Sequence, residues 1–147
     1  MNACDAEGSS PLLEAIGSGC VDLVLLLLQR QANPRHVRGC DGCTPLLAAV
    51  RADLATRVLA ALLDAGAAAD MWDQLGNTPL IEAASTGNLE CLSMLLSRVP
   101  LTSINHSNSM GETALMRAAG QTRDPQLLPT LLAAGASTCV DSVDFNG

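Results

Sequence analysis

The chain has 147 residues, of which 48% are hydrophobic and 1% aromatic, and its formal net charge is −7. All of its basic residues are arginine and they form no extended basic stretch, which argues against nucleic-acid binding. The longest apolar run, residues 23–28, is far shorter than the roughly 20 residues that cross a bilayer, so we expect no membrane insertion.

The cysteines and the first residues indicate a compartment. The six cysteines lack the spacing of a disulfide framework, and residues 1–5 contain neither a basic segment nor an apolar stretch of a secretory signal. We therefore expect reduced thiols and an intracellular protein, cytoplasmic or nuclear.

Short helices are predicted wherever Ser or Thr precedes Pro. Ser10-Pro11, Thr44-Pro45 and Thr78-Pro79 each combine a capping hydroxyl with a proline at the first helical position. A leucine-rich second helix follows each of these starts, and also follows Thr113. These second helices end in Leu27-Leu28, Leu62-Leu63, Leu95-Leu96 and Leu131-Leu132.

The same order of elements recurs along the whole chain. Gly8, Gly42, Gly76 and Gly111 are separated by 34, 34 and 35 residues. We infer one domain over 1–147, with repeats at about 5–38, 39–72, 73–107 and 108–143 and the start of a fifth repeat at 144–147. Because neither end looks like a polar cap, we expect the chain to be an excerpt of a longer array.

The repeated pattern, Asp-x-x-Gly-x-Thr-Pro-Leu, then Ala-Ala, then Leu-Leu-x-x-Gly-Ala, resembles the ankyrin repeat. The resemblance implies an all-α solenoid of stacked helix-turn-helix units with finger loops, in which the first helices line a concave groove. It also implies binding of another protein or peptide, without enzymatic activity.

Several positions depart from the family pattern. The usual His after Thr-Pro-Leu is replaced by Leu13, Leu47, Ile81 and Met116, so apolar packing must replace its polar contacts. Pro100-Leu101 occupies the place of the Gly-Ala seen at Gly66-Ala67 and Gly135-Ala136. We expect the finger that follows the third repeat, 101–111, to depart from the usual turn. Repeats two and four hold one extra residue between their helices, and Pro129 should bend or delay the last helix.

Residues that suggest chemistry are few. Cys40 and Cys43 form a CxxC with His36 nearby, but no fourth ligand is apparent, so we expect no metal and no cofactor. His36 and His106 are expected on solvated loops, and we predict no catalytic residue. Glu82 and Arg117 stand at equivalent helix positions and are predicted to pair with each other.

Partner-binding residues are predicted on the fingers and along the groove. Arg35, His36 and Arg38 form a basic tip that either docks an acidic or phosphorylated segment or is simply solvated. Trp72 is expected to be an exposed anchor, although it could instead fold onto Met71 or the adjacent finger. The predicted partner-binding residues are Arg38, Cys43, Arg51, Trp72, Gln74, Leu75, Asn77, Met110 and Glu112.

The sequence thus predicts a monomeric protein-interaction module. One alternative is a regulatory or substrate-recruiting domain of a larger enzyme or ubiquitin ligase complex. Another is a small cyclin-dependent-kinase inhibitor. Such inhibitors shorten the first helix of their second repeat, whereas residues 45–51 have the pattern of a normal helix, which disfavours that alternative.

Overall fold

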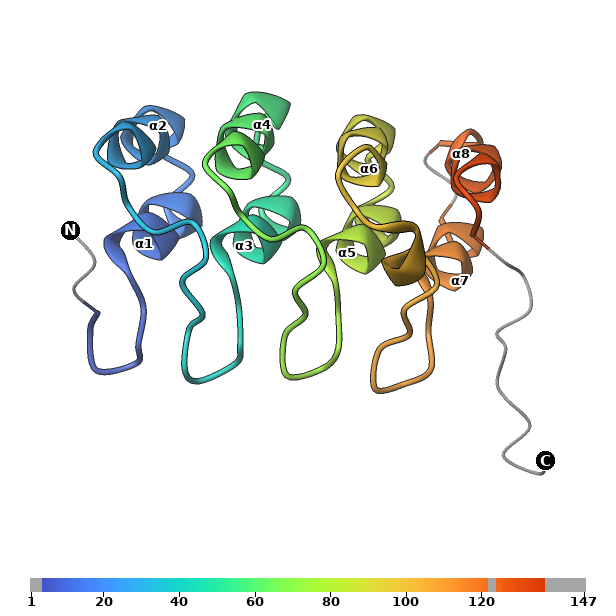
Figure 1. Ribbon diagram of the computed structural model, residues 1–147, viewed down its shortest axis with the longest axis horizontal. Coiled ribbons are helices and arrows are strands. Elements are labelled where there is room, and N and C mark those ends of the chain that lie inside the picture. Colours follow the sequence, from blue (N-terminus) through green and yellow to red (C-terminus); the bar gives the residue numbers. More distant parts are fainter. Residues whose placement is uncertain (1–3, 122–123, 137–147) are drawn as a thin grey trace.

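The described part of the chain forms a row of four stacked helix pairs with finger loops along one edge (Figure 1). The computed structural model describes residues 4–121 and 124–136. The expected start of a fifth repeat at 144–147 lies outside these residues. The helices of the described residues are α1 (Pro11–Gly17), α2 (Val21–Gln29), α3 (Pro45–Arg51), α4 (Thr56–Asp64), α5 (Pro79–Thr86), α6 (Leu89–Leu96), α7 (Ala114–Ala119) and α8 (Leu127–Ala133), with a short 3-10 helix η1 (Leu101–Ser103) between α6 and α7.

The helices form two layers. The inner layer holds α1, α3, α5 and α7, the outer layer holds α2, α4, α6 and α8, and the fingers extend from the inner layer on the side away from the outer one (Figure 1). In each layer a helix packs on the next helix of the same layer, and each pair also packs within its own repeat. Because contacts join neighbouring repeats, stability is a sum of repeat and interface contributions.

A hydroxyl caps every inner helix. The side chains of Ser10, Thr44, Thr78 and Thr113 accept hydrogen bonds from the backbone amides three residues later, at 3.2–3.4 Å. Proline follows the cap in α1, α3 and α5, where the missing N–H leaves no hydrogen bond unmade. The Ser/Thr-Pro pattern therefore predicted these helix starts correctly.

Small side chains bring the inner helices together. Ala49, Ala83 and Ala84 are fully buried, while leucines such as Leu59 and Leu92 of the outer helices fill the space behind them. Both groups belong to one continuous core. The all-α architecture is confirmed, since the described residues contain no strand beyond a single bridge between Ser107 and Thr113.

The positions that replace the family's histidine behave in two ways. Leu13, Leu47 and Ile81 are buried, as the prediction of apolar packing requires. Met116 is 45% exposed, so the prediction is wrong for this repeat. Met116 lines an apolar hollow between α7 and α8 on the last described repeat.

Proline alters the loops of repeats three and four. Pro100 has an extended backbone and leads into η1, so the start of the segment 101–111 departs from the other loops as predicted. The turn at its end keeps the usual form, since Asn108 Oδ1 accepts the amides of Met110 and Glu112 as Asp73 does in the preceding finger. The last helix starts only at Leu127, after a turn in which Asp124 Oδ1 accepts the amide of Gln126 at 2.8 Å.

Of the helices in the described part of the chain, none is both long and apolar enough to cross a membrane.

Candidate functional site: the finger loops

Each finger is a six-residue turn with glycine at its fifth position. The fingers are residues 4–9, 38–43, 72–77 and 107–112. In the first, third and fourth fingers the second residue holds the turn: one side-chain oxygen of Asp5, Asp73 or Asn108 accepts two backbone amides of the same finger at 2.8–3.0 Å. Such a side chain satisfies donors that the turn leaves without partners.

The second finger is held differently because its second residue is Gly39. Asp41 accepts the amide of Cys43 at 3.0 Å, and Arg38 donates to both oxygens of Asp41 at 2.9 and 2.5 Å. The Arg38 guanidinium, helped by the Cys43 amide and opposed by burial, lowers the pKa of Asp41 to about 2. This finger therefore uses its own charges to keep its shape.

Backbone hydrogen bonds join neighbouring fingers. The amide of Gln74 donates to the carbonyl of Asp41 at 3.0 Å, and that of Ser109 to the carbonyl of Leu75 at 2.9 Å. Gly76 has a φ of +76°, and a side chain there would lie 3.0 Å from the Asn108 backbone. Glycine thus permits both the left-handed turn and the close approach of the next finger.

Both histidines connect fingers rather than facing solvent alone. His36 Nε2 lies 2.6 Å from the carbonyl of Gly8, and His106 Nε2 lies 3.1 Å from that of Gly76. The histidines lie on loops, as predicted, but they are half-buried and not fully solvated, because each imidazole contacts the carbonyl of the glycine in the preceding finger. These contacts reinforce the spacing of the fingers.

Three apolar side chains of the third and fourth fingers are exposed, and we call them the apolar strip: Trp72, Leu75 and Met110. Their exposed fractions are 56, 60 and 66%. The Trp72 ring stacks on His106 with the ring centroids 4.9 Å apart and the planes inclined by 19°. Trp72 therefore packs against the loop of the adjacent finger, as one of the two predictions for this residue allowed, and more than half of its surface is still exposed to solvent.

An ion-pair network ties the third finger to the inner helices. Arg51 Nη2 donates to Asp73 Oδ2 and also to Glu82 Oε1, the latter at 2.6 Å. Burial raises the pKa of Asp73, but the hydrogen bonds from Arg51 and from backbone amides outweigh it and hold that pKa below its ordinary value. Asp73 is therefore ionised at neutral pH.

The predicted pair of Glu82 with Arg117 is not formed. Glu82 binds Arg51, and Arg117 Nε lies 3.1 Å from Glu112 Oε2. Glu112, at the sixth position of the fourth finger, is two residues before α7, the helix that carries Arg117. Both predicted groove residues Arg51 and Glu112 thus lie at the junction of fingers and inner helices, already paired.

Two predicted contact residues are buried. Cys43 and Asn77, at the sixth position of their fingers, are 2 and 6% exposed. Cys43 Sγ contacts the carbonyl of Thr44 at 3.6 Å, and Asn77 Oδ1 accepts from Asn108 Nδ2 at 2.9 Å. They support the fingers from beneath, which corrects the prediction that they face a partner. Gln74, in contrast, is exposed as predicted.

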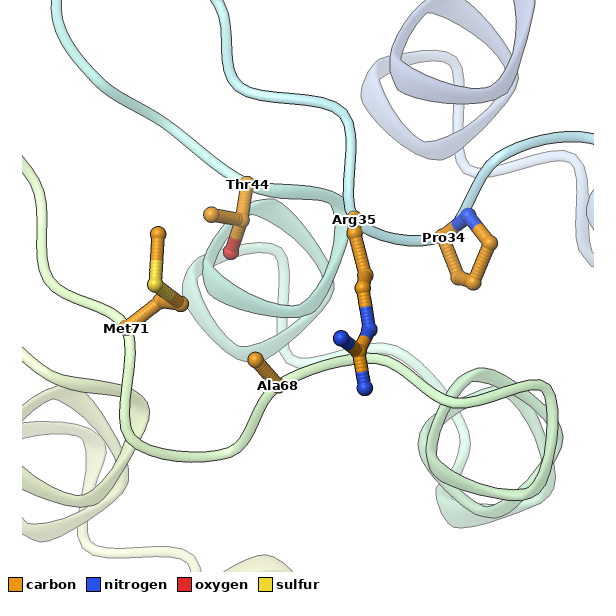
Figure 2. A pocket seen from close by; sticks show the side chains of 5 residues that line it. All are labelled: Pro34, Arg35, Thr44, Ala68 and Met71. Carbon is orange, nitrogen blue, oxygen red and sulfur yellow. The ribbon is translucent and has the colours of Figure 1, made fainter.

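The predicted basic tip is largely engaged within the protein. Arg38 binds Asp41, and Arg35 Nε donates to the carbonyl of Gly66 at 2.6 Å. Figure 2 shows Arg35 beside a cavity of about 240 Å³ whose other lining residues are Pro34, Thr44, Ala68 and Met71. Since Thr44 uses its hydroxyl as a helix cap, this small cavity offers a ligand little polar recognition.

The cysteines divide into exposed and buried thiols. Cys20 and Cys40 are exposed, Cys43 and Cys91 are buried, and no disulfide is present among the cysteines of the described residues. Burial raises the pKa of Cys91 to about 12. The described residues also contain no group of three or more His, Cys, Asp or Glu placed to hold a metal ion.

Comparison with known proteins identifies the repeat. The family model described as Ankyrin repeats (3 copies) matches residues 52–142, which is more than half of the chain. The chain belongs to the ankyrin repeat family. It is also 31% identical over 95 residues to the Neurogenic locus notch homolog protein 1 of Xenopus tropicalis, a match that covers 65% of this chain and 4% of that protein.

Ankyrin repeats are generally protein–protein interaction modules and are generally not enzymes. The sequence placed Trp72, Leu75 and Met110 on the fingers, but it missed the side chains that hold the turns. Asp5, Asp73 and Asn108 each stand three residues before the glycine of their finger, so this spacing could have predicted their common role. The histidine bridges had no such signal, because they depend on the packing of one loop against another.

Proposed function

We propose that this ankyrin array binds a partner protein or peptide through its concave groove and finger loops, with the apolar strip as the anchor. One observation carries the proposal: Trp72, Leu75 and Met110 are exposed on adjoining fingers whose turns are held by other side chains. Exposed apolar side chains that serve no core are typical of interaction sites.

The stack of Trp72 on His106 favours binding. A ring that is already fixed loses little conformational freedom when a partner covers it. Tryptophan is also enriched among the residues that dominate binding energy. Gln74, Arg38, Arg51 and Glu112 would supply a polar rim, while Cys43 and Asn77 keep the fingers in place.

The location, the oligomeric state and the cofactor content follow from the same surface and from the exposed thiols. The exposed thiols Cys20 and Cys40 favour a reducing, intracellular location, and we expect a monomer that carries no cofactor. The alternative of a recruiting domain within a larger enzyme or ubiquitin ligase complex would use the same surface.

Capture of partners from cell extract tests the proposal. Trp72→Ala should weaken the binding of the captured partner by about 2 kcal/mol, while the midpoint of thermal unfolding changes little, because Trp72 is outside the core. The matched control is Leu26→Ala, which shortens another exposed apolar side chain on the outer helix α2. A Trp72→Ala variant that retains its partners but melts markedly earlier would assign Trp72 to packing alone.

A further inference from the structure

We propose that the fingers bind an extended segment with an apolar end and a basic end, the apolar end on the third and fourth fingers and the lysine or arginine end on the first. This proposal deepens the proposed function, on which it depends. It assigns the partner a chemistry and a direction along the array.

The first observation is the row of side chains at the fourth position of the fingers. In chain order these are Glu7, Asp41, Leu75 and Met110, so the tips are acidic on the first two fingers and apolar on the last two. Repeated hydrogen bonds keep the second, third and fourth tips in register, since Gln74 binds Asp41 and Ser109 binds Leu75 through backbone groups. A ligand that follows the tips meets a change from acidic to apolar chemistry.

The second observation is the distribution of ion pairs. Asp41 is neutralised by Arg38, Asp73 and Glu82 share Arg51, and Glu112 pairs with Arg117. Each carboxylate on the second, third and fourth fingers therefore has an arginine partner, although Asp73 shares Arg51 with Glu82. Asp70, two residues before the third finger, is the one nearby carboxylate of the described residues that is in none of these pairs.

The carboxylates on and beside the first finger differ, because no arginine of the described residues forms an ion pair with them. Asp5, Glu7 and Glu14 take part in no ion pair within residues 4–121 and 124–136. Asp5 accepts backbone amides, and Glu14 accepts the hydroxyl of Ser9 at 2.6 Å, which brings α1 and the first finger together. Within the described part of the chain, three carboxylates outside any ion pair thus lie at this end, where they complement a basic segment.

The spacing sets the length of the segment. Packed helices lie 8–10 Å apart, so about 30 Å separates the first finger from the fourth. An extended chain that rises about 3.3 Å per residue needs roughly nine residues to cover this distance. An extended ligand of roughly six residues would reach from the first finger to Trp72 on the third, about 20 Å away, and the longer segment is needed to cover Met110 on the fourth as well.

Trp72 provides a direct measurement, because it is the only tryptophan and the chain has no tyrosine. The probes are synthetic peptides of about twelve residues without Trp or Tyr, with three leucines at one end and three lysines at the other, in both chain directions. Matched peptides carry glutamates in place of the lysines. In low salt, the better lysine peptide should shift Trp72 emission with at least fivefold higher affinity than its glutamate counterpart, and added salt should remove most of this advantage.

Charge removal tests the assigned end. The double variant Glu7→Gln, Glu14→Gln should lower the preference for lysine at least threefold, whereas Asp22→Asn with Glu90→Gln, which removes two charges from the outer helices, should leave it unchanged. Equal affinity for the two kinds of peptide, or a preference unaffected by the first double variant, would overturn the proposal. A partner from cell extract that needs Trp72 but does not compete with the lysine peptide would overturn it too, while leaving the proposed function intact.

Discussion

The second and third fingers have the same glycine and the same helix cap, yet they hold their turns in different ways. In the second, Arg38 and Asp41 pair across the turn and thereby occupy its first and fourth positions. In the third, the buried Asp73 binds two backbone amides from beneath, so Trp72 and Leu75 at those two positions are left exposed.

The difference shows that stability and recognition can be assigned to separate residues of one turn. A finger held by its exposed side chains has few of them left for a partner. A finger held by a buried carboxylate can present apolar groups at its tip, because its shape does not depend on them.

The largest effect is expected from the glycine that lets two fingers approach. Gly76→Ala should lower the free energy of unfolding by about 3 kcal/mol, since the new methyl group meets the Asn108 backbone and alanine is strained at this φ. Gly111→Ala is the matched control, with a φ of +77° but no neighbouring atom within 4 Å, and should cost about 1 kcal/mol. Equal losses in urea unfolding would show that backbone strain, and not the approach of the fingers, determines the effect.

Asp73 should have the next largest effect. Asp73→Ala removes the acceptor of two backbone amides and should cost about 2 kcal/mol. Asp73→Asn should cost about half as much, because Asn108 holds the fourth finger with an amide oxygen in the same position. If the asparagine variant is as unstable as the alanine variant, the ion pair with Arg51 and not the turn is the dominant contribution.

Acid should lower the stability that Asp41 gives to the second finger and Asp73 to the third. The pKa values of Asp41 and Asp73 are held below the ordinary aspartate value of 3.8, that of Asp41 at about 2. Their contribution to stability is therefore complete above about pH 4 and is lost as the pH falls through the folded-state values. The free energy of unfolding, measured by urea titration between pH 7 and 2, should decline below pH 4, and less steeply in Asp73→Asn; an identical slope in that variant would contradict this assignment.

The smallest effect is expected in the second finger. Arg38→Gln should cost about 0.5 kcal/mol, because the pair with Asp41 is partly exposed and screened by salt. The pKa of Asp41, followed by NMR, should rise toward 3.8 in this variant. An unchanged pKa would mean that the Cys43 amide, and not Arg38, keeps Asp41 ionised.

Local chemistry made much of the fold predictable. Ser10-Pro11 and its counterparts set the helix starts through contacts within four residues, and the glycine spacing gave the number of helix pairs. The partner of Arg117 could not be predicted in this way, because equivalent positions on successive helices are separated by the width of a helix while Glu112 is brought close by the finger. Likewise, the burial of Cys43 and Asn77 depends on how one finger covers the next.

The two buried thiols, Cys43 and Cys91, allow local opening of the array to be measured by chemical labelling. Cys43 lies beneath the second finger and Cys91 in the outer helix of the third repeat, and neither can react with an alkylating reagent until its surroundings separate. Exposed Cys20 and Cys40 would react at once under the same conditions. The labelling rates of the two buried thiols therefore report how often each repeat opens, and a ligand seated on the third and fourth fingers should slow the labelling of Cys91 more than that of Cys43.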